Sequence, residues 1–326
     1  MSIFYQKKSE SIINNNQIIV SSLVSGTIAG SRTTLLPMTT MASKNQVSNN
    51  LVLEDGYNTD YIYAMITALF YTPTDGMNKI INTDTNNSNT YYVQEYIKSK
   101  FILPIHRNMS IESGIVNKFR LFLYNCGWLK NNDKHILDRS NLDDFYRFII
   151  TNMMKYDLVI SKIDAVINIS KEHKYDMIRI TEDHIFDEKK DPTIINLSSM
   201  VERWIQIDVL GQNISYKFES VPYILPIYLD IRDPNTGLNK RCINIMEGIK
   251  FSDNGDKIQR MFVWEIHSLI CQKSTGEYYT IVIDHNDEMM AFSDRHVPSN
   301  WRIDNTDPQY VKDIMREVRF VFYKLQ

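Results

Sequence analysis

The chain has 326 residues, of which 43% are hydrophobic and 23% charged, and its formal net charge is −3. This composition is typical of a globular protein with a sizeable core, arranged as one large domain or two ordinary ones. The near balance of charge excludes bulk electrostatic attraction to nucleic acid or to an anionic membrane, so neither is expected as a partner. No apolar run approaches the roughly 20 residues of a membrane-spanning helix.

The three cysteines, Cys126, Cys242 and Cys271, are widely spaced and form no C-x-x-C pair. The sequence therefore predicts no zinc site, no disulfide framework and no cofactor. It favours a reducing, intracellular setting. The N-terminus has no basic region followed by an apolar core, so no secretory signal is expected.

The first 50 residues are polar and lack a periodic apolar pattern. Runs such as Asn14-Asn15-Asn16 and the Ser/Thr/Gly-rich stretch 21–34 favour irregular chain. We expect an extended or irregular arm over residues 1–50, in which the pattern is compatible with a strand at Gln17–Val20. A single domain is expected to follow over 51–326.

Residues 51–160 are predicted to be mainly helical, and they begin with a polar loop that leads into a buried helix. Asn58 and Thr59 are candidate N-caps of that helix, because their short side chains can accept from the free N–H groups of a first turn. Apolar residues then repeat at helical spacing at Ile62, Met65, Ile66 and Leu69. Further helices are expected at Tyr91–Phe101, Ser110–Tyr124 and Ser140–Met154.

Residues 161–326 change to alternating and β-branched patterns, which favour strands. Ser199 with Glu202 is a candidate capping box for a short helix at Met200–Gln206. The expected strands are Ile214–Phe218, Val221–Leu229, Cys242–Ile249 and Phe262–Gln272, with a turn at Asp233–Gly237.

Residues 55–70, DGYNTDYIYAMITALF, resemble the cysteine box of the ubiquitin-specific proteases. That family places its nucleophile at a helix start, in a pattern close to N-x-G-N-T-C-Y-M-N-S-x-L-Q-x-L-F. Asn58-Thr59 matches N-T, Tyr61 matches the aromatic residue after the cysteine, and Ala68-Leu69-Phe70 matches the end. Asp60 stands in the place of the nucleophile, and Asp55 stands in that of the oxyanion-hole asparagine.

Three later stretches resemble other boxes of the same family in the same order. Residues 141–145 match the end of the Q-D-A-x-E-F run, and residues 221–229 are similar to its central palm strand. Residues 264–279 resemble the histidine box, with Glu277 in the place of the catalytic histidine. Phe292–Val297 matches F-x-D-x-x-V, so Asp294 keeps the place of the third member of the triad.

The resemblance covers roughly residues 52–326 and implies an α+β, papain-like fold with a helical thumb over 51–160 and a β-rich palm and fingers over 161–326. The family's zinc-carrying fingers hold two C-x-x-C pairs, which this sequence lacks. The fingers are therefore expected to be reduced and free of zinc.

The same resemblance argues against the family's chemistry. Cysteine proteolysis needs a thiolate, a base and an oxyanion donor. Asp60 has no thiol, Glu277 cannot form an imidazolium, and an ionised Asp55 would repel a developing oxyanion. We therefore expect that the chain has no deubiquitinase activity.

Three hypotheses about function stay open. The first is a pseudo-deubiquitinase that binds or scaffolds ubiquitin, a ubiquitin-like protein or another protein partner. In the second, Asp60, Glu277 and Asp294, with Asp55 beside them, share a proton as a hydrolytic dyad or share a divalent cation. The third is a purely structural component, for example of a viral particle or larger complex, which fits the polar N-terminal arm because such segments can order on a partner. The abundance of Asn, Ile, Lys and Tyr, with few Gly and Pro, suggests an A+T-rich coding genome such as that of a large DNA virus or a protist.

Overall fold

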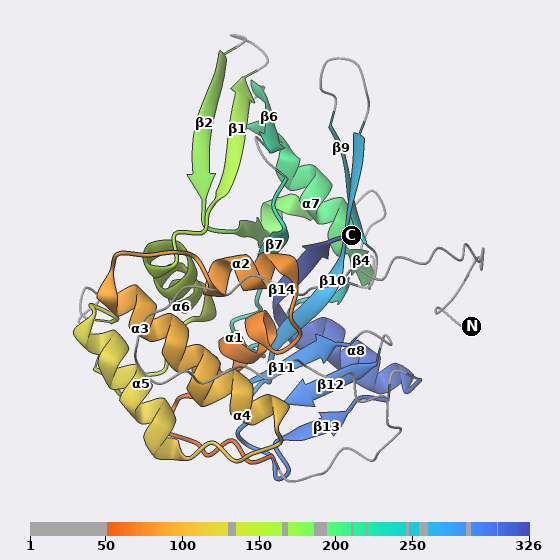
Figure 1. The fold of residues 1–326 in the computed structure, drawn as a ribbon. Helices are drawn as coiled ribbons and strands as arrows, with labels where there is room; N and C mark the ends of the chain where they lie inside the picture. The colour runs from red at the N-terminus through yellow and green to blue at the C-terminus, as the bar shows by residue number, and fades with distance from the viewer. Residues whose placement is uncertain are drawn as a thin grey trace, which may run out of the picture. The chain divides into compact units, whose positions relative to one another are not determined.

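A helical half packs against a large, mostly antiparallel sheet in the computed structural model of the protein (Figure 1). The structure describes residues 51–129, 135–164, 169–185, 194–209, 212–218, 221–245, 248–253, 260–284, 288–304 and 306–326. All of them belong to one unit, Gln46–Gln326. The predicted N-terminal arm and the strand at Gln17–Val20 lie outside the described residues.

The helical half begins with α1 and ends at Met153, as the sequence pattern predicts. Its α-helices are α1 (Asp60–Phe70), α2 (Asp75–Ile81), α3 (Ser88–Tyr96), α4 (Leu103–His106), α5 (Ser113–Asn125) and α6 (Leu142–Tyr146). Two π-helical segments extend them, η1 (Ile97–Ile102) between α3 and α4 and η3 (Arg147–Met153) after α6. Each of the helices predicted in this half is present, with boundaries that differ by a few residues.

The main sheet has the strand order β13-β12-β11-β10-β14-β7-β3, and β9 pairs with β10. Its strands are β3 (Ile178–Thr181), β7 (Ile224–Asp230), β9 (Ile249–Asp253), β10 (Arg260–Gln272), β11 (Tyr278–Ile283), β12 (Met289–Phe292), β13 (Asn300–Arg302) and β14 (Val318–Leu325). All of these pairings are antiparallel except that of β3 with β7. Through these antiparallel hairpins, the neighbouring strands β10 and β11 both lie against α1.

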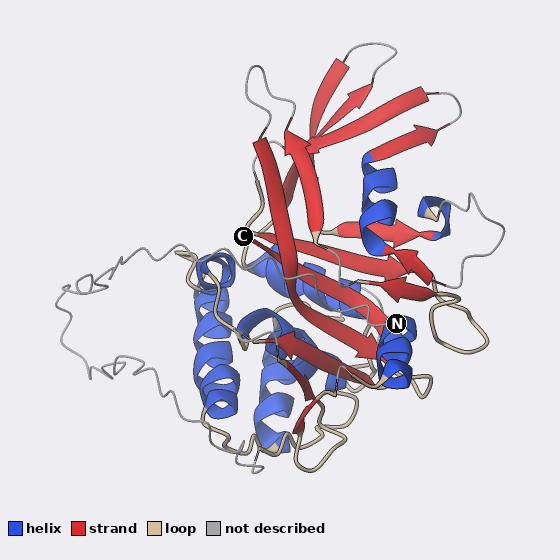
Figure 2. Ribbon diagram, turned by 90° about the vertical axis from the view of Figure 1, so that its right-hand side faces the viewer, coloured by secondary structure: helices blue, strands red, loops and turns tan. Residues whose placement is uncertain are grey.

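A second sheet, of order β2-β1-β6-β5, extends away from the helical half (Figures 1 and 2). Its strands are β1 (Leu158–Asp164), β2 (Ile169–Tyr175), β5 (Gln206–Val209) and β6 (Gln212–Phe218). The remaining described elements are η4 (Glu182–His184), β4 (Ile194–Asn196), α7 (Leu197–Ile205), β8 (Cys242–Asn244) and α8 (Pro308–Glu317).

Two local predictions are wrong. The single strand expected at Cys242–Ile249 is two strands, because β8 pairs with β4 whereas β9 pairs with β10. The capping box of Ser199 and Glu202 does not start a helix, because α7 begins two residues earlier, at Leu197, directly after β4. In both cases pairing with a distant strand sets the boundary that local pattern misplaced.

The helix α1 is buried along its whole length, which explains why its sequence is apolar on every face. Two hydroxyl groups of the sheet donate to its backbone: Ser268 Oγ to Ala68 O at 2.6 Å, and Thr280 Oγ1 to Ala64 O at 2.7 Å. These buried bonds fix the rotation of α1 against β10 and β11. The residue at its N-terminus is therefore held beside the start of β11.

The strand β14 separates the two parts of the core. Its side chains alternate, so that Phe320 and Phe322 face the helices while Val321 and Tyr323 face the opposite side of the sheet. Both faces of the strand are buried, as in a central strand covered by layers on both sides. In the part of the chain that the structure describes, no helix is long and apolar enough to cross a membrane.

Candidate functional site

The loop before α1 is held in a left-handed conformation. Tyr57 and Asn58 have φ values of 66° and 57°, which non-glycine residues adopt at some cost. The buried Arg120 holds this shape, because Nη1 donates to Tyr57 O at 2.7 Å and Nη2 donates to Gly56 O at 3.1 Å. Gly56 is packed so tightly that a Cβ there would lie 2.7 Å from Val116 Cγ1.

The loop delivers Asp60 to the first turn of α1. Thr59 occupies the N-cap position, but its Oγ1 accepts from Gly56 N at 2.9 Å and makes no capping bond to the helix. Asp60 is an acid in that first turn, where the helix dipole favours a negative charge. The prediction of Thr59 as N-cap is confirmed in position, while its hydroxyl stabilises the preceding loop.

Both carboxylate oxygens of Asp60 are engaged by other parts of the chain. Arg139 Nε donates to Oδ1 at 3.1 Å, and the backbone N–H of Tyr278 donates to Oδ2 at 2.8 Å. The side chain of Asp60 is fully buried. Burial raises the pKa of Asp60, and the bond from Tyr278 and the charge of Arg139 oppose that rise.

Arg139 joins the helical half to the sheet. Besides its contact with Asp60, its Nη1 donates to Gly276 O, in the turn between β10 and β11, at 3.0 Å. Gly276 has a φ of +89°, and a Cβ there would lie 3.2 Å from Arg139 Nη1. Glycine therefore permits both the turn and the close approach of the guanidinium.

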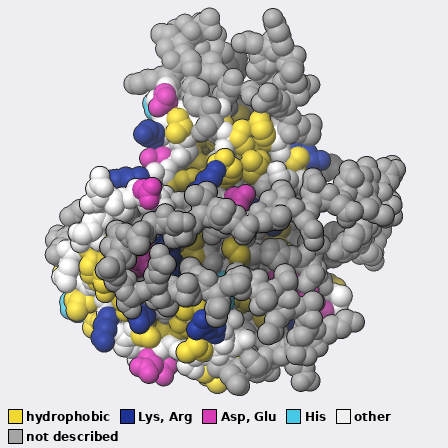
Figure 3. Space-filling view, viewed as in Figure 1, with side chains coloured by type: hydrophobic (Ala, Val, Ile, Leu, Met, Phe, Trp, Pro, Cys, Tyr) yellow, Lys and Arg dark blue, Asp and Glu magenta, His cyan; other side chains and the backbone are white. Residues whose placement is uncertain are grey.

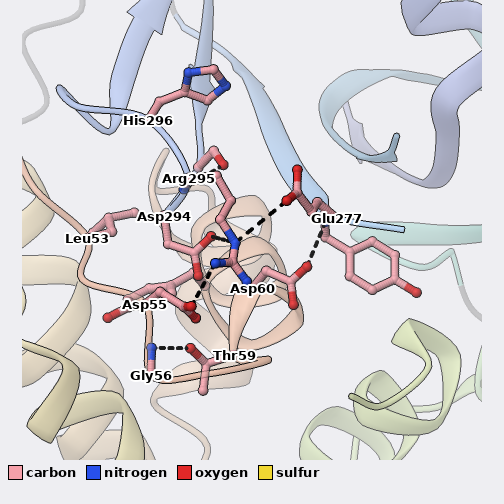
Figure 4. A network of polar contacts seen from close by, with 12 residues as sticks. Leu53, Asp55, Gly56, Thr59, Asp60, Glu277, Asp294, Arg295 and His296 are labelled. Carbon is pink, nitrogen blue, oxygen red and sulfur yellow. Dashed lines mark hydrogen bonds and ion pairs between the residues drawn. The ribbon is translucent and has the colours of Figure 1, made fainter. Parts of the chain in front are cut away.

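A second arginine, Arg295, lies among the other acidic residues of the site (Figure 4). Its Nη1 is 2.7 Å from Asp55 Oδ2, and its Nε is 3.9 Å from both Glu277 Oε1 and Asp294 Oδ1. Arg295 and Asp55 are about one-third exposed, so this group of charges is open to solvent on one side.

Asp294 differs from its neighbours in having no hydrogen-bond donor. Its side chain is fully buried, and neither carboxylate oxygen accepts a hydrogen bond from another residue of the described chain. Burial, and then the charges of Asp60 and Asp55, raise the pKa of Asp294 to about 7, which Arg295 counteracts in part. Near neutral pH the carboxyl group is therefore divided between its protonated and ionised forms.

His296, the histidine near this network, does not point its ring into it. His296 follows Arg295, but its ring is turned away from Asp60 (Figure 4). The ring lies against Trp301, with a centroid distance of 4.6 Å, and its Nε2 is 3.4 Å from Lys273 Nζ. Burial and the charge of Lys273 lower the pKa of His296.

The arrangement does not fit a metal ion. Among the described residues no group of three or more His, Cys, Asp and Glu side chains could hold one. Arg139 and Arg295 instead balance the negative charge of the acidic residues. In the hypothesis of a shared divalent cation, the metal ion would lie between these carboxylates. The guanidinium of Arg295 occupies that position, so none of suitable geometry is vacant.

All four positions predicted from the sequence, Asp55, Asp60, Glu277 and Asp294, come together in one network (Figure 4). Sequence analysis missed the two arginines that balance them. Arg295 directly follows Asp294 and lies inside the matched F-x-D-x-x-V stretch, so it could have been found. Arg139 lies outside every matched stretch and gives no such signal.

The helix that resembles the family's second box also lies where expected. Phe145 of α6 packs edge-on against Tyr61 of α1, with ring centroids 5.0 Å apart. Trp128 contacts both, since its Nε1 is 3.4 Å from the Tyr61 hydroxyl and its ring is 5.3 Å from that of Phe145. The helix α6 therefore packs beside α1.

The fold is an α+β, papain-like fold of the type found in ubiquitin-specific proteases and related ubiquitin hydrolases. A chain of the SAGA DUB module of Ubp8, Sgf11, Sus1 and Sgf73 bound to monoubiquitin is similar, with a TM-score of 0.56 and 12% identity over 88% of this chain and 72% of that chain. A chain of the Saccharomyces cerevisiae Pan2 pseudoubiquitin hydrolase–RNA exonuclease module in complex with RNA has a TM-score of 0.58 and 12% identity. This second match covers 91% of the present chain and 57% of the Pan2 chain. No family model and no curated protein sequence matches the chain.

Proposed function

We propose that the chain is a pseudo-deubiquitinase, a non-catalytic binding or scaffolding module for ubiquitin or a ubiquitin-like protein. One observation carries the proposal. Asp60 stands where the family's nucleophile is expected, and both of its oxygens are engaged by Arg139 and by the backbone of Tyr278. A group held in this way joins two halves of the domain and has no free oxygen with which to attack a substrate.

The rest of the site supports the same conclusion. Acyl transfer needs an activated nucleophile with a base beside it. Glu277 is paired with Arg295 at 3.9 Å, and it has no imidazole that could protonate a leaving amine. Attack by a carboxylate on an isopeptide would give an anhydride, which is uphill in free energy. Asp55 is bonded to Tyr57 N and to Arg295, so it does not offer a donor to an oxyanion.

The structural neighbours agree with a binding role in two ways. The SAGA DUB module was solved with monoubiquitin, and the Pan2 module is described as a pseudoubiquitin hydrolase. A fold shared with both is compatible with retained recognition and lost chemistry. The three cysteines, which are widely spaced and form no C-x-x-C pair, support an intracellular setting for the module, with another protein as the alternative partner.

The acidic-site hypothesis has one supporting feature, the raised pKa of Asp294 next to Asp60. It is weaker because Asp60 is tied to two donors and cannot share a proton symmetrically with Asp294. The third hypothesis, a component of a viral particle or larger complex, depends largely on residues 1–50, which lie outside the described residues.

The deciding experiment titrates ¹⁵N-labelled ubiquitin with the protein while a fluorogenic ubiquitin substrate is tested in parallel. We expect specific chemical-shift changes in ubiquitin and no cleavage. The same shifts should persist in Asp60→Asn, which keeps an acceptor for Tyr278 N and so preserves the fold. Cleavage by wild type that disappears in Asp60→Asn would establish that the protein is an enzyme. The absence of chemical-shift changes would mean that the protein binds a partner other than ubiquitin.

A further inference from the structure

Two arginine side chains meet at one carbonyl oxygen, beside the turn that follows β7. Arg232 Nε donates to Gly237 O at 2.9 Å, and Arg319 Nη2 donates to the same oxygen. Gly237 has a φ of +68°, and a Cβ there would lie 3.0 Å from Arg232 Nη2. The turn thus brings two positive charges to a single neutral acceptor.

Neither of these arginines has a carboxylate within ion-pair distance in the described part of the chain. Arg319 is buried, and its other bonds go to the amide oxygens of Gln272 and Asn239. Arg232 is exposed and bonded only to Gly237. By contrast, Arg139 and Arg179 each contact an aspartate.

The acidic residues within two positions of these arginines in sequence are bonded elsewhere. Asp233 Oδ1 accepts from Asn235 N at 2.8 Å, within its own turn. Glu317 accepts from the Tyr279 hydroxyl at 2.6 Å. Burial, and then the like charge of Arg232, lower the pKa of Arg319 to about 10.

A third arginine borders the same place. The Cβ position of Gly237 lies 3.6 Å from Ser274 O, in the turn between β10 and β11, and Arg139 donates to Gly276 O of that turn. Burial and the charge of Asp60 raise the pKa of Tyr278 to about 12, while Arg232, Arg139 and Arg319 lower it. Arg139 is paired with Asp60, so the positive charge without a carboxylate partner at this turn belongs to Arg232 and Arg319.

We propose that Arg232 and Arg319 form an anion-binding site, the basic turn site, which receives a carboxylate or phosphate group from an acidic segment of a protein partner. The exposed Arg232 makes the direct contact, because a planar guanidinium can grip either group with two hydrogen bonds. The buried Arg319 supplies positive potential from behind. The chain as a whole is acidic, at −3, so this site does not reflect an overall positive surface.

The test measures the fluorescence anisotropy of a fluorescein-labelled hexaglutamate peptide at low ionic strength, with the full chain and two variants. Arg232→Gln removes the exposed contact. Arg302→Gln is the matched control, because Arg302 is also exposed but is paired with Glu288 at 3.0 Å. Both variants change the net charge equally, and thermal melting checks that both fold.

We expect at least tenfold weaker peptide binding by Arg232→Gln and less than a twofold change in Arg302→Gln. Competition by inorganic phosphate, compared with chloride at equal ionic strength, distinguishes the ligands: stronger displacement by phosphate assigns the site to phosphate groups, and equal displacement assigns it to carboxylates. No binding at millimolar protein, or equal loss in both variants, would overturn the proposal. The ubiquitin titration is separate, so peptide binding without ubiquitin shifts would reject the proposed function and keep this site.

Discussion

Asp60 and Asp294 are both fully buried carboxylates in one network, yet the chain treats them in opposite ways. Asp60, at the helical side, accepts from Arg139 and from Tyr278 N. Asp294, at the sheet side, accepts from no other described residue and has only Arg295 Nε at 3.9 Å. The difference teaches that burial alone does not tell what a carboxylate does. Two donors oppose the rise that burial causes in the pKa of Asp60, whereas Asp294, without such donors, takes up a proton near neutral pH.

The largest expected effect comes from Asp294→Asn. The pKa of Asp294 in the folded state is about 7, above its unfolded value, so its contribution to stability is fully present below about pH 4 and is lost as pH rises through 7. Relative to wild type, Asp294→Asn should therefore gain free energy of unfolding between pH 4 and 8, on the order of 4 kcal/mol. Urea denaturation across this pH range measures the gain.

The control for that experiment is Asp84→Asn, at an exposed aspartate of the loop before α3. Its difference from wild type should stay small at every pH. A difference between Asp294→Asn and wild type that does not change with pH would show that Asp294 is ionised throughout.

His267, in β10, is a buried group whose contribution to stability changes with pH in the opposite direction. Neither ring nitrogen has a hydrogen-bond partner among the described residues, and burial lowers its pKa to about 4. Its neutral form stabilises the fold above pH 6.5, and that stability is lost as pH falls towards 4. We expect wild type to lose on the order of 3 kcal/mol relative to His267→Leu over this window.

The two groups should oppose each other between pH 4 and 6.5. Wild type is then expected to have a flatter stability profile than either single variant, because one slope rises with pH while the other falls. Urea denaturation of wild type, Asp294→Asn and His267→Leu in one buffer series checks this. Parallel profiles for the three proteins would contradict it.

Asp60→Ala should destabilise the domain by about 2–3 kcal/mol, because it leaves Arg139 and the Tyr278 N–H without their acceptor. The exposed quarter of Arg139 keeps the cost below that of a wholly buried pair. Asp60→Asn, which keeps one acceptor, should cost less. Thermal melts at pH 7 compare them, and an equal loss in both variants would mean that the acceptor kept by Asn contributes nothing to stability.

Gly276→Ala gives the smallest effect, a loss of about 1–2 kcal/mol. Alanine is strained at a φ of +89°, and its Cβ would lie 3.2 Å from Arg139 Nη1, so the guanidinium must shift from Asp60. Gly114→Ala is the matched control, because a Cβ there meets nothing within 4 Å in α5 and alanine favours a helix. Changes of opposite sign in the denaturant midpoint relative to wild type would confirm the prediction for the two variants. Changes of equal sign would refute it.

The order of the matched stretches determined from sequence alone that Asp55, Asp60, Glu277 and Asp294 would meet. The apolar residues that repeat at helical spacing over 62–69 likewise predicted α1, because this spacing places them on one helix face that has to be buried. Each of these signals is local, or depends on a resemblance whose order along the chain can be read directly.

Only the tertiary structure decided how the charges are balanced. Arg139 reaches Asp60 from 79 residues away, and Tyr278 N reaches it from 218 residues away. No periodic pattern encodes such a contact, because it depends on how α1 is rotated against β10 and β11 by the bonds from Ser268 and Thr280. The sequence named the acidic residues of the site, and packing decided which of them is paired and which takes up a proton.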